Sequence, residues 1–407
     1  MADQLDFEAA LERRLQARAS LASRPFDASA IAEAAVVAHA PRRLALPWTF
    51  RGIAWGWVAV MLATLAIVGG TLLAGALLRD PYQGPWLAYT SMDGLYIAHE
   101  DGTHPRRIFA SANRLSLSGW SADGTFIAVV EEVASDNVVN GRTLVVDRDG
   151  RVVWSIEGNL QAVWSNHGHR LAWMSAGPSL VATDVDTGTT STWLAGSPDT
   201  MAGDPAWSPD DTWIALNWYE GSTGPGNLRI VADDGSFRDV LESPSWMAPL
   251  WSPDGGLISV VIRDATICGQ AADGSCPSDI VIVDPATGAQ VDGIRNLNWV
   301  MGRAWSPDGT RLAWDEIVRA GKQENLFVGT LPLSGGAPVQ VTDWPGAALV
   351  LGWTSDGTSL LAAHNIWSEN GTGREPNELW RVPVDPTDGE PVLLRADVFD
   401  AALQPTP

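Results

Sequence analysis

The stretch Ala304-Trp305-Ser306-Pro307-Asp308-Gly309-Thr310-Arg311-Leu312-Ala313-Trp314 decides the fold of this chain of 407 residues. Its Pro-Asp-Gly centre has the composition of a tight turn, because proline fixes the φ of the first central position and glycine takes the positive φ that closes the turn. Apolar residues alternate along the sequence on both sides, which is typical of half-buried strands. The stretch therefore predicts a β-hairpin.

The same unit recurs along the chain. Its six copies are Trp120–Gly124, Trp164–Gly168, Trp207–Asp211, Trp251–Gly255, Trp305–Gly309 and Trp353–Gly357. The tryptophans that open successive copies are 43 to 54 residues apart. A period of about 40–50 residues built from strands and turns indicates the blades of a β-propeller.

The number of blades depends on the two ends of the repeat region. Residues 86–108 resemble a blade that lacks its first strand, and residues 398–405 align position by position with residues 300–307. The C-terminal residues can therefore supply the missing inner strand and close the ring, which removes exposed sheet edges. The expected fold is all-β, a seven-bladed propeller; if the tail does not dock, it has six blades and a fragment.

The repeat resembles the WD40-like "PD40" repeat of the TolB-type propeller family, with Trp305–Trp314 and Trp251–Ile258 as its best matches. The resemblance covers roughly residues 86–407. It implies a TolB-like propeller that interacts with other proteins of the cell envelope. Propellers of this type serve as binding platforms and as gates in front of peptidases, so the resemblance specifies fold more closely than function.

The segment before the propeller predicts a membrane anchor. Residues 52–78 carry no charge and are flanked by Arg51 and Arg79, and a helix of this length reaches roughly 40 Å, enough to cross a bilayer. A cleaved signal peptide is the alternative, but the apolar run and the residues before it are too long for one. We expect a cytoplasmic helical segment at 1–50, a transmembrane helix at 51–79 and an extracytoplasmic propeller at 80–407. The arginines before the span set this orientation in the inner membrane.

Charge excludes one class of partner for the propeller. Residues 80–407 carry 18 basic and 42 acidic residues. Nucleic-acid binding needs clustered lysine and arginine to contact phosphates. We therefore expect no nucleic-acid partner.

The repeated polar residues fit structural roles. The turn position of the repeat is occupied by Asp123, His167, Asp210, Asp254, Asp308 and Asp356. The turn alone accounts for these residues, and the blades spread them far apart. His167 and His169 form a short pair with too few further ligands nearby for zinc. We expect no metal site, and we expect the repeated tryptophans to pack between blades.

Two cysteines, Cys268 and Cys276, lie in the longest repeat interval, inside an apparent insertion. Outside the membrane, so close a pair favours a disulfide that pins this loop, with two free thiols as the alternative.

The longest connections are those between the second and third strands, which emerge together on one face of a four-stranded propeller. Variable loops on a rigid scaffold are the usual place for binding. The acidic candidates on these loops are Glu131, Glu132, Asp136, Glu220, Asp264, Asp273, Glu324, Glu369 and Glu375. They predict a cationic ligand for this face.

No Gly-x-Ser-x-Gly, Walker or dinucleotide-binding motif is present, so we expect neither enzyme activity nor a cofactor. The layout is similar to that of single-pass bacterial anti-sigma regulators, although residues 1–50 contain no cysteine and only one histidine, which departs from their zinc motif. The favoured interpretation is a membrane-anchored interaction or sensor module of the cell envelope, with a sigma factor as one candidate partner of residues 1–50. The alternatives are a scaffold without signalling, or an exported glycan or peptide hydrolase or lyase that uses the propeller funnel.

Overall fold

The computed structural model describes residues 82–405, except for 136–137, 159–161, 176, 222–225, 243–246, 264–276, 320–322 and 365–376, and gives only the backbone of 133–135, 138–140 and 318–319. The chain divides into two units, Met1–Asp80 and Pro81–Pro407. The predicted helical segment and transmembrane helix lie outside the described residues. Within the described part, no helix is long and apolar enough to span a membrane.

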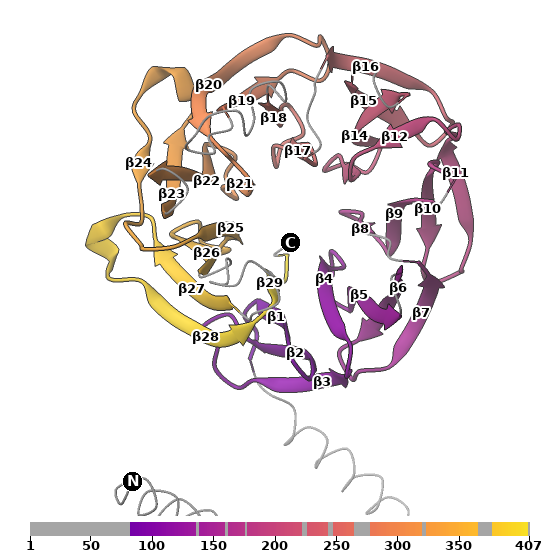
Figure 1. The fold of residues 1–407 in the computed structure, drawn as a ribbon, viewed down its shortest axis with the longest axis horizontal. Helices are drawn as coiled ribbons and strands as arrows, with labels where there is room; N and C mark the ends of the chain where they lie inside the picture. The colour runs from indigo at the N-terminus through magenta and orange to yellow at the C-terminus, as the bar shows by residue number, and fades with distance from the viewer. Residues whose placement is uncertain are drawn as a thin grey trace, which may run out of the picture. The chain divides into compact units, whose positions relative to one another are not determined.

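The described residues form seven sheets arranged radially around a central axis (Figure 1). Blade 1 contains β1 (Trp86–Ser91), β2 (Gly94–His99), β3 (Arg106–Ala110) and β29 (Asp400–Leu403). Blade 2 contains β4 (Arg114–Trp120), β5 (Phe126–Ser135), β6 (Val138–Asp147) and β7 (Val152–Glu157). Blade 3 contains β8 (Val163–Trp164), β9 (Arg170–Met174), β10 (Leu180–Asp184) and β11 (Thr190–Leu194). Blade 4 contains β12 (Thr200–Ala202), β13 (Ala206–Trp207), β14 (Trp213–Glu220), β15 (Gly226–Ala232) and β16 (Phe237–Glu242).

The last three blades follow the same order, with strands numbered outward from the axis. Blade 5 contains β17 (Leu250–Trp251), β18 (Ile258–Arg263), β19 (Pro277–Val283) and β20 (Gln290–Asn298). Blade 6 contains β21 (Arg303–Trp305), β22 (Arg311–Arg319), β23 (Gln323–Thr330) and β24 (Val339–Gln340). Blade 7 contains β25 (Ala348–Trp353), β26 (Ser359–His364), β27 (Asn377–Pro383) and β28 (Val392–Val398). Two 3-10 turns, η1 (Leu333–Gly335) and η2 (Pro386–Asp388), complete the described elements.

The predicted closure of the ring is confirmed. Strand β29 pairs antiparallel with β1, with Leu87 opposite Leu403 and Thr90 opposite Asp400. Blade 1 is therefore built from both ends of the repeat region, and the propeller has seven blades rather than six. The innermost position of β29 beside β1 is visible in Figure 1. Pairing β29 with β1 gives the inner edge of β1 the hydrogen-bond partners that a strand edge otherwise lacks.

The repeated tryptophans connect neighbouring blades, as predicted. In each copy the indole Nε1 donates a hydrogen bond to a backbone carbonyl of the preceding blade, 3.0–3.2 Å away. The acceptor belongs to the residue directly before that blade's own repeat tryptophan, or before Leu403 in blade 1. Four of the six rings are buried and two, those of Trp251 and Trp305, are half-buried. The equivalent position in blade 1 is Leu403, which has no such donor. Buried indole groups of this kind need a partner, and the neighbouring backbone supplies it.

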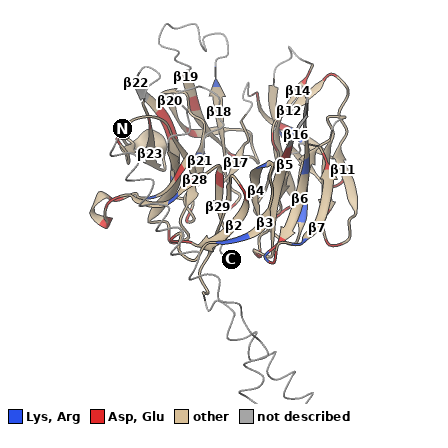
Figure 2. Cartoon of the chain, turned by 60° about the horizontal axis from the view of Figure 1, so that its bottom comes forward, with Lys and Arg blue, Asp and Glu red and all other residues tan. Residues whose placement is uncertain are grey.

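Two faces follow from this topology. The turn face carries the connections from first to second strand and from third to fourth strand, and the loop face carries the others. The described chain enters and leaves at the turn face: Tyr82 stacks on His99 at 3.9 Å between ring centroids, and Gln404 accepts a hydrogen bond from Arg148 at 3.1 Å. Figure 2 shows the propeller from the side, with the C-terminus at this end.

Candidate functional site

The turn face is built from a repeated Ser-x-Asp turn. In blade 6 the hydroxyl of Ser306 donates to Asp308 Oδ1 at 2.5 Å, and the same oxygen accepts the backbone N–H of Thr310 at 3.0 Å. The hydrogen bond from Ser306, together with the one from Thr310, lowers the pKa of Asp308 to about 2. Equivalent side-chain bonds form at Asp123, Asp210, Asp254 and Asp356. These aspartates shape the turns, as predicted.

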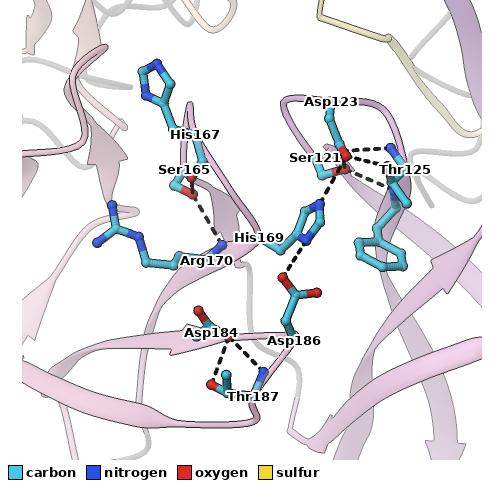
Figure 3. A network of polar contacts seen from close by, with 11 residues as sticks. Ser121, Asp123, Thr125, Ser165, His167, His169, Arg170, Asp184, Asp186 and Thr187 are labelled. Atoms are coloured by element: carbon cyan, nitrogen blue, oxygen red, sulfur yellow. Dashed lines mark hydrogen bonds and ion pairs between the residues drawn. The ribbon is translucent and has the colours of Figure 1, made fainter.

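The two histidines at the repeat turn of blade 3, His167 and His169, contact different partners. His169 contacts Asp186 through Nδ1 at 2.8 Å and Asp123 of the preceding blade through Nε2 at 3.2 Å (Figure 3). His167 Nδ1 lies 3.4 Å from Asp211 Oδ2 of the following blade. Burial opposes the charged form of His169, but the hydrogen bonds with Asp186 and Asp123 outweigh it and raise the pKa of the imidazole. The pair links three blades and does not converge on one ligand.

Asp211 takes the place of the turn glycine in the fourth blade. Its side chain is buried and accepts the backbone N–H groups of Asn166 and His167, each at 2.7 Å. Its backbone has a φ of 59°, a conformation that aspartate tolerates better than most residues. The described residues contain no group of three or more histidine, cysteine or acidic side chains placed to hold a metal ion.

A cleft of about 460 Å³ opens on the turn face between blades 4 and 5. Its apolar walls include Trp213, Trp251 and Pro209. The carboxylates of Asp210 and Asp254 and the guanidinium of Arg238 also line it, together with Ser208, Ile230, Gly255, Pro285, Ala286 and His167. Arg238 donates to the carbonyls of Pro285 and Ala286, which fixes its guanidinium against blade 5. The cleft thus combines an aromatic surface with two carboxylates. It was not predicted from the sequence.

The predicted acidic positions of the loop face fall into four groups: exposed, buried, half-buried and outside the described residues. Glu220, at the end of β14, has an 80% exposed side chain and lies 3.8 Å from Arg229. Glu131 and Glu324 are 5% and 2% exposed and belong to strands β5 and β23, so they are not surface charges. Glu132 is half-buried in β5 and accepts a hydrogen bond from Ser116 at 3.3 Å. Asp136, Asp264, Asp273, Glu369 and Glu375 lie outside the described residues, as do Cys268 and Cys276.

Glu131 and Glu132 do not lie on a loop, contrary to the prediction. Strand β5 continues to Ser135 and β6 begins at Val138, so both residues belong to a strand hairpin. Glu131 is held there by Arg142 Nε at 2.7 Å and by the hydroxyl of Ser111 at 2.7 Å. A buried carboxylate persists only with such partners.

A second hollow, of about 190 Å³, lies on the loop face between blades 7 and 1. Asp400, Glu378 and Asn377 supply its polar lining, and Leu349, Leu351, Ala363, Leu379, Val398 and Phe399 supply its apolar lining. Burial raises the pKa of Asp400 to about 6, even though the carboxylate accepts the backbone N–H of Leu117 at 3.0 Å. This hollow is small, but it places a titratable carboxylate at the face where binding was predicted.

Two buried ionisable side chains, those of Asp315 and Arg303, hold blades 5, 6 and 7 together. Asp315 is fully buried and accepts the N–H groups of Met301 and Gly302 at 2.8 and 2.7 Å and of Val350 in blade 7 at 3.3 Å. Burial raises its pKa to about 7, opposed by these three hydrogen bonds. Arg303 donates to the carbonyls of Ala248 and Ser259 in blade 5 at 2.8 and 3.3 Å.

Gly302 is required for this arrangement. A Cβ atom at this position would lie 2.5 Å from Asp315 Oδ2 and 2.7 Å from the carbonyl oxygen of Val350. The backbone can approach the carboxylate so closely only because the residue is glycine. The local sequence marks this site by an acidic residue, Asp315, directly after the apolar run Leu312-Ala313-Trp314.

Comparisons with known proteins support the fold. No family model matches the chain, and no curated protein matches it. Among solved structures, it is similar to a prolyl endopeptidase, with 15% identity, a TM-score of 0.52 and coverage of 83% of this chain and 55% of that one. It is also similar to a β-propeller domain from Myceliophteria thermophila, with 14% identity, a TM-score of 0.50 and coverage of 70% and 92%. TolB from Acinetobacter baumannii matches with 14% identity, a TM-score of 0.45 and coverage of 82% and 70%.

At these identities the similarity establishes the propeller fold alone. The chain spans about half the length of the prolyl endopeptidase. The solved propellers that it resembles include this enzyme and a propeller domain whose name indicates no activity. The fold therefore does not decide between catalysis and binding.

Proposed function

We propose that the chain is a membrane-anchored β-propeller of the cell envelope whose loop face binds a partner protein. The observation that carries this proposal is the contrast between the two faces. On the turn face the connections are short and their side chains are used by the turns themselves, as at Asp308. On the loop face two connections from second to third strand are much longer, those between Arg263 and Pro277 and between His364 and Asn377, whereas those of blades 1, 2 and 6 are short, contrary to the general prediction. Long loops on a rigid scaffold are where binding sites concentrate.

Charge favours a basic partner. The region from residue 80 onward carries 42 acidic against 18 basic residues, and complementary charge steers association and suppresses wrong partners.

A photoreactive amino acid at position 220 of the full chain tests the loop face in intact cells of the source organism. Asp149, exposed on the turn face, is the control position. We expect a crosslinked protein from position 220 and none from position 149. Reversing the charges of two predicted loop residues, Asp264→Lys and Asp273→Lys, should weaken this crosslink. Equal crosslinking from both positions, or no effect of charge reversal, would overturn the proposal.

Signalling is the finer form of this proposal. The apolar positions Leu11 and Leu15 lie on one predicted helical face of the N-terminal segment. Capture of a sigma factor by the full chain, lost in the variant Leu11→Asp/Leu15→Asp, would support a regulator. Identical capture profiles for the two proteins would favour an envelope scaffold without signalling.

A further inference from the structure

The cleft between blades 4 and 5 lacks a cation that two other turn-face grooves contain. In those two grooves the residue six positions after one repeat tryptophan is an arginine that lies over the tryptophan of the following blade, whereas between blades 2 and 3 the same position holds Phe126. In the groove between blades 3 and 4, the Arg170 guanidinium lies 4.8 Å from the ring centroid of Trp207. In the groove between blades 6 and 7, that of Arg311 lies 4.6 Å from the ring centroid of Trp353.

These two arginines are also anchored by polar contacts. Arg311 Nη2 donates to the carbonyl of Gly357, the glycine of the following turn, at 2.7 Å. Arg170 Nη2 lies 3.5 Å from the carboxylate of Asp211. In both grooves the guanidinium therefore stacks over an indole, which is a favourable cation–π geometry. In both it also contacts an acceptor in the turn of the following blade.

Between blades 4 and 5 the corresponding residue is Trp213, and no guanidinium among the described residues lies over Trp251. Both indoles instead line the open cleft of about 460 Å³, a volume in the range of ligand-binding pockets. The wall includes Gly255, the glycine that corresponds to Gly357. The groove therefore offers an indole face and a turn glycine without the chain's own cation.

Two carboxylates complete the lining. The hydrogen bonds within the turns are made to Oδ1 of Asp210, from Ser208 and Thr212, and to Oδ1 of Asp254. Among the described residues, neither Oδ2 atom receives a hydrogen bond. The hydrogen bonds from Ser208 and Ser252 are the largest cause of the lowered pKa values of the two aspartates, so both are ionised at neutral pH. They outnumber the one guanidinium of the cleft, Arg238, which is committed to backbone carbonyls.

We propose that this cleft binds an arginine side chain presented by a partner protein, with its guanidinium over Trp251 and between Asp210 and Asp254. Arginine fits better than lysine because a planar guanidinium stacks on an indole while it donates several hydrogen bonds in fixed directions. The site lies on the turn face, so it is separate from the loop-face interaction and goes beyond the proposed function.

The test uses the full chain and capped pentapeptides with one central residue, arginine, lysine, citrulline or leucine, between glycines. Saturation-transfer NMR suits the expected weak binding, with a dissociation constant of about 1 mM. We expect saturable binding of the arginine peptide and at least about tenfold weaker binding of the citrulline peptide, which keeps the shape and loses the charge. Competition by the free amino acid arginine tests whether the peptide backbone contributes.

Two variants remove the site in different ways. Trp213→Arg places the chain's own guanidinium in the groove, as Arg170 and Arg311 do, and should abolish peptide binding without unfolding the protein. Asp210→Asn/Asp254→Asn keeps the Oδ1 acceptors of the turns and removes both charges, which should weaken binding at least about tenfold. The matched control is Asp308→Asn/Asp356→Asn, with the same chemistry at the groove that Arg311 already fills.

Several results would overturn the proposal. These are undiminished binding in Trp213→Arg, an equal loss in the control variant, or no saturable binding of the arginine peptide up to tens of millimolar. Equal binding of the leucine peptide would make the cleft an apolar site instead, and equal binding of the lysine peptide would remove the selectivity for guanidinium.

Discussion

Replacing Asp315 by alanine should lower the free energy of unfolding of the propeller by about 3–5 kcal/mol. The fully buried carboxylate accepts three backbone N–H groups, two from the residues directly before β21 and one, that of Val350, in blade 7. In the alanine variant these donors would remain in the protein interior without an acceptor. A buried donor that loses its partner costs about 1–3 kcal/mol, and the long bond to Val350 lies at the low end.

The asparagine variant separates the loss of acceptors from the loss of volume. With its amide oxygen at the position of Oδ2, Asp315→Asn keeps the acceptor for Gly302 and Val350 and turns its NH₂ toward the N–H of Met301. It should therefore lose about 1–3 kcal/mol, less than the alanine variant. Chemical denaturation of the full chain at neutral pH, followed by circular dichroism, measures both differences.

Asp308→Ala is the control in the same blade. It also removes two hydrogen bonds, from Ser306 and Thr310, but Asp308 is exposed and water can replace them. Asp308→Ala should therefore lower the free energy of unfolding clearly less than Asp315→Ala does. If the two alanine variants were equally stable, or if Asp315→Ala cost less than about 1 kcal/mol, burial of the acceptor would not be the cause.

Three further predictions follow from the inter-blade contacts. Trp353→Phe removes the indole N–H that donates to Ala304 and should cost about 1–2 kcal/mol; an unchanged denaturation midpoint would contradict a stabilising role for this bond. Burial raises the pKa of Asp400 from 3.8 to about 6, so in this window the folded protein holds a proton that the unfolded chain has lost. Stability should fall as pH rises through it, by on the order of 2–3 kcal/mol, and the fall should be smaller in Asp400→Asn. Ending the chain at Phe399 removes β29 and exposes the edge of β1, so this protein should aggregate in size-exclusion chromatography, whereas deletion of 406–407 should not cause aggregation.

The blades could be predicted from the sequence because their signals are local. Each Ser-x-Asp turn lies within five residues, and the tryptophan before it marks the end of an inner strand. Even the long-range pairing of β29 with β1 was predictable, because residues 398–405 repeat the pattern of residues 300–307. The strand limits were less accurate: β5 continues past the apolar pattern to Ser135, since Arg142 and Ser111 satisfy the buried carboxylate of Glu131.

The sites could not be predicted in the same way because they depend on single positions that differ between blades. Asp315 accepts an N–H from Val350, 35 residues away and in another blade. The cleft on the turn face depends on the residue after each turn, which is arginine at 170 and 311 but tryptophan at 213. The sequence shows that these residues differ. Only the structure shows that the side chain at this position lies against the tryptophan of the next blade.

The two proposed sites lie at opposite ends of the strands, so their tests can be interpreted independently. Strand β14 starts at Trp213 beside the cleft and ends at Glu220 on the loop face. Its eight residues separate the two ends by roughly 25 Å at about 3.3 Å per residue. An arginine side chain bound over Trp251 cannot reach that distance. Loss of peptide binding in Trp213→Arg with an unchanged crosslink from position 220 would therefore establish two separate interaction surfaces. Loss of both would instead indicate one partner large enough to contact both ends of blade 4.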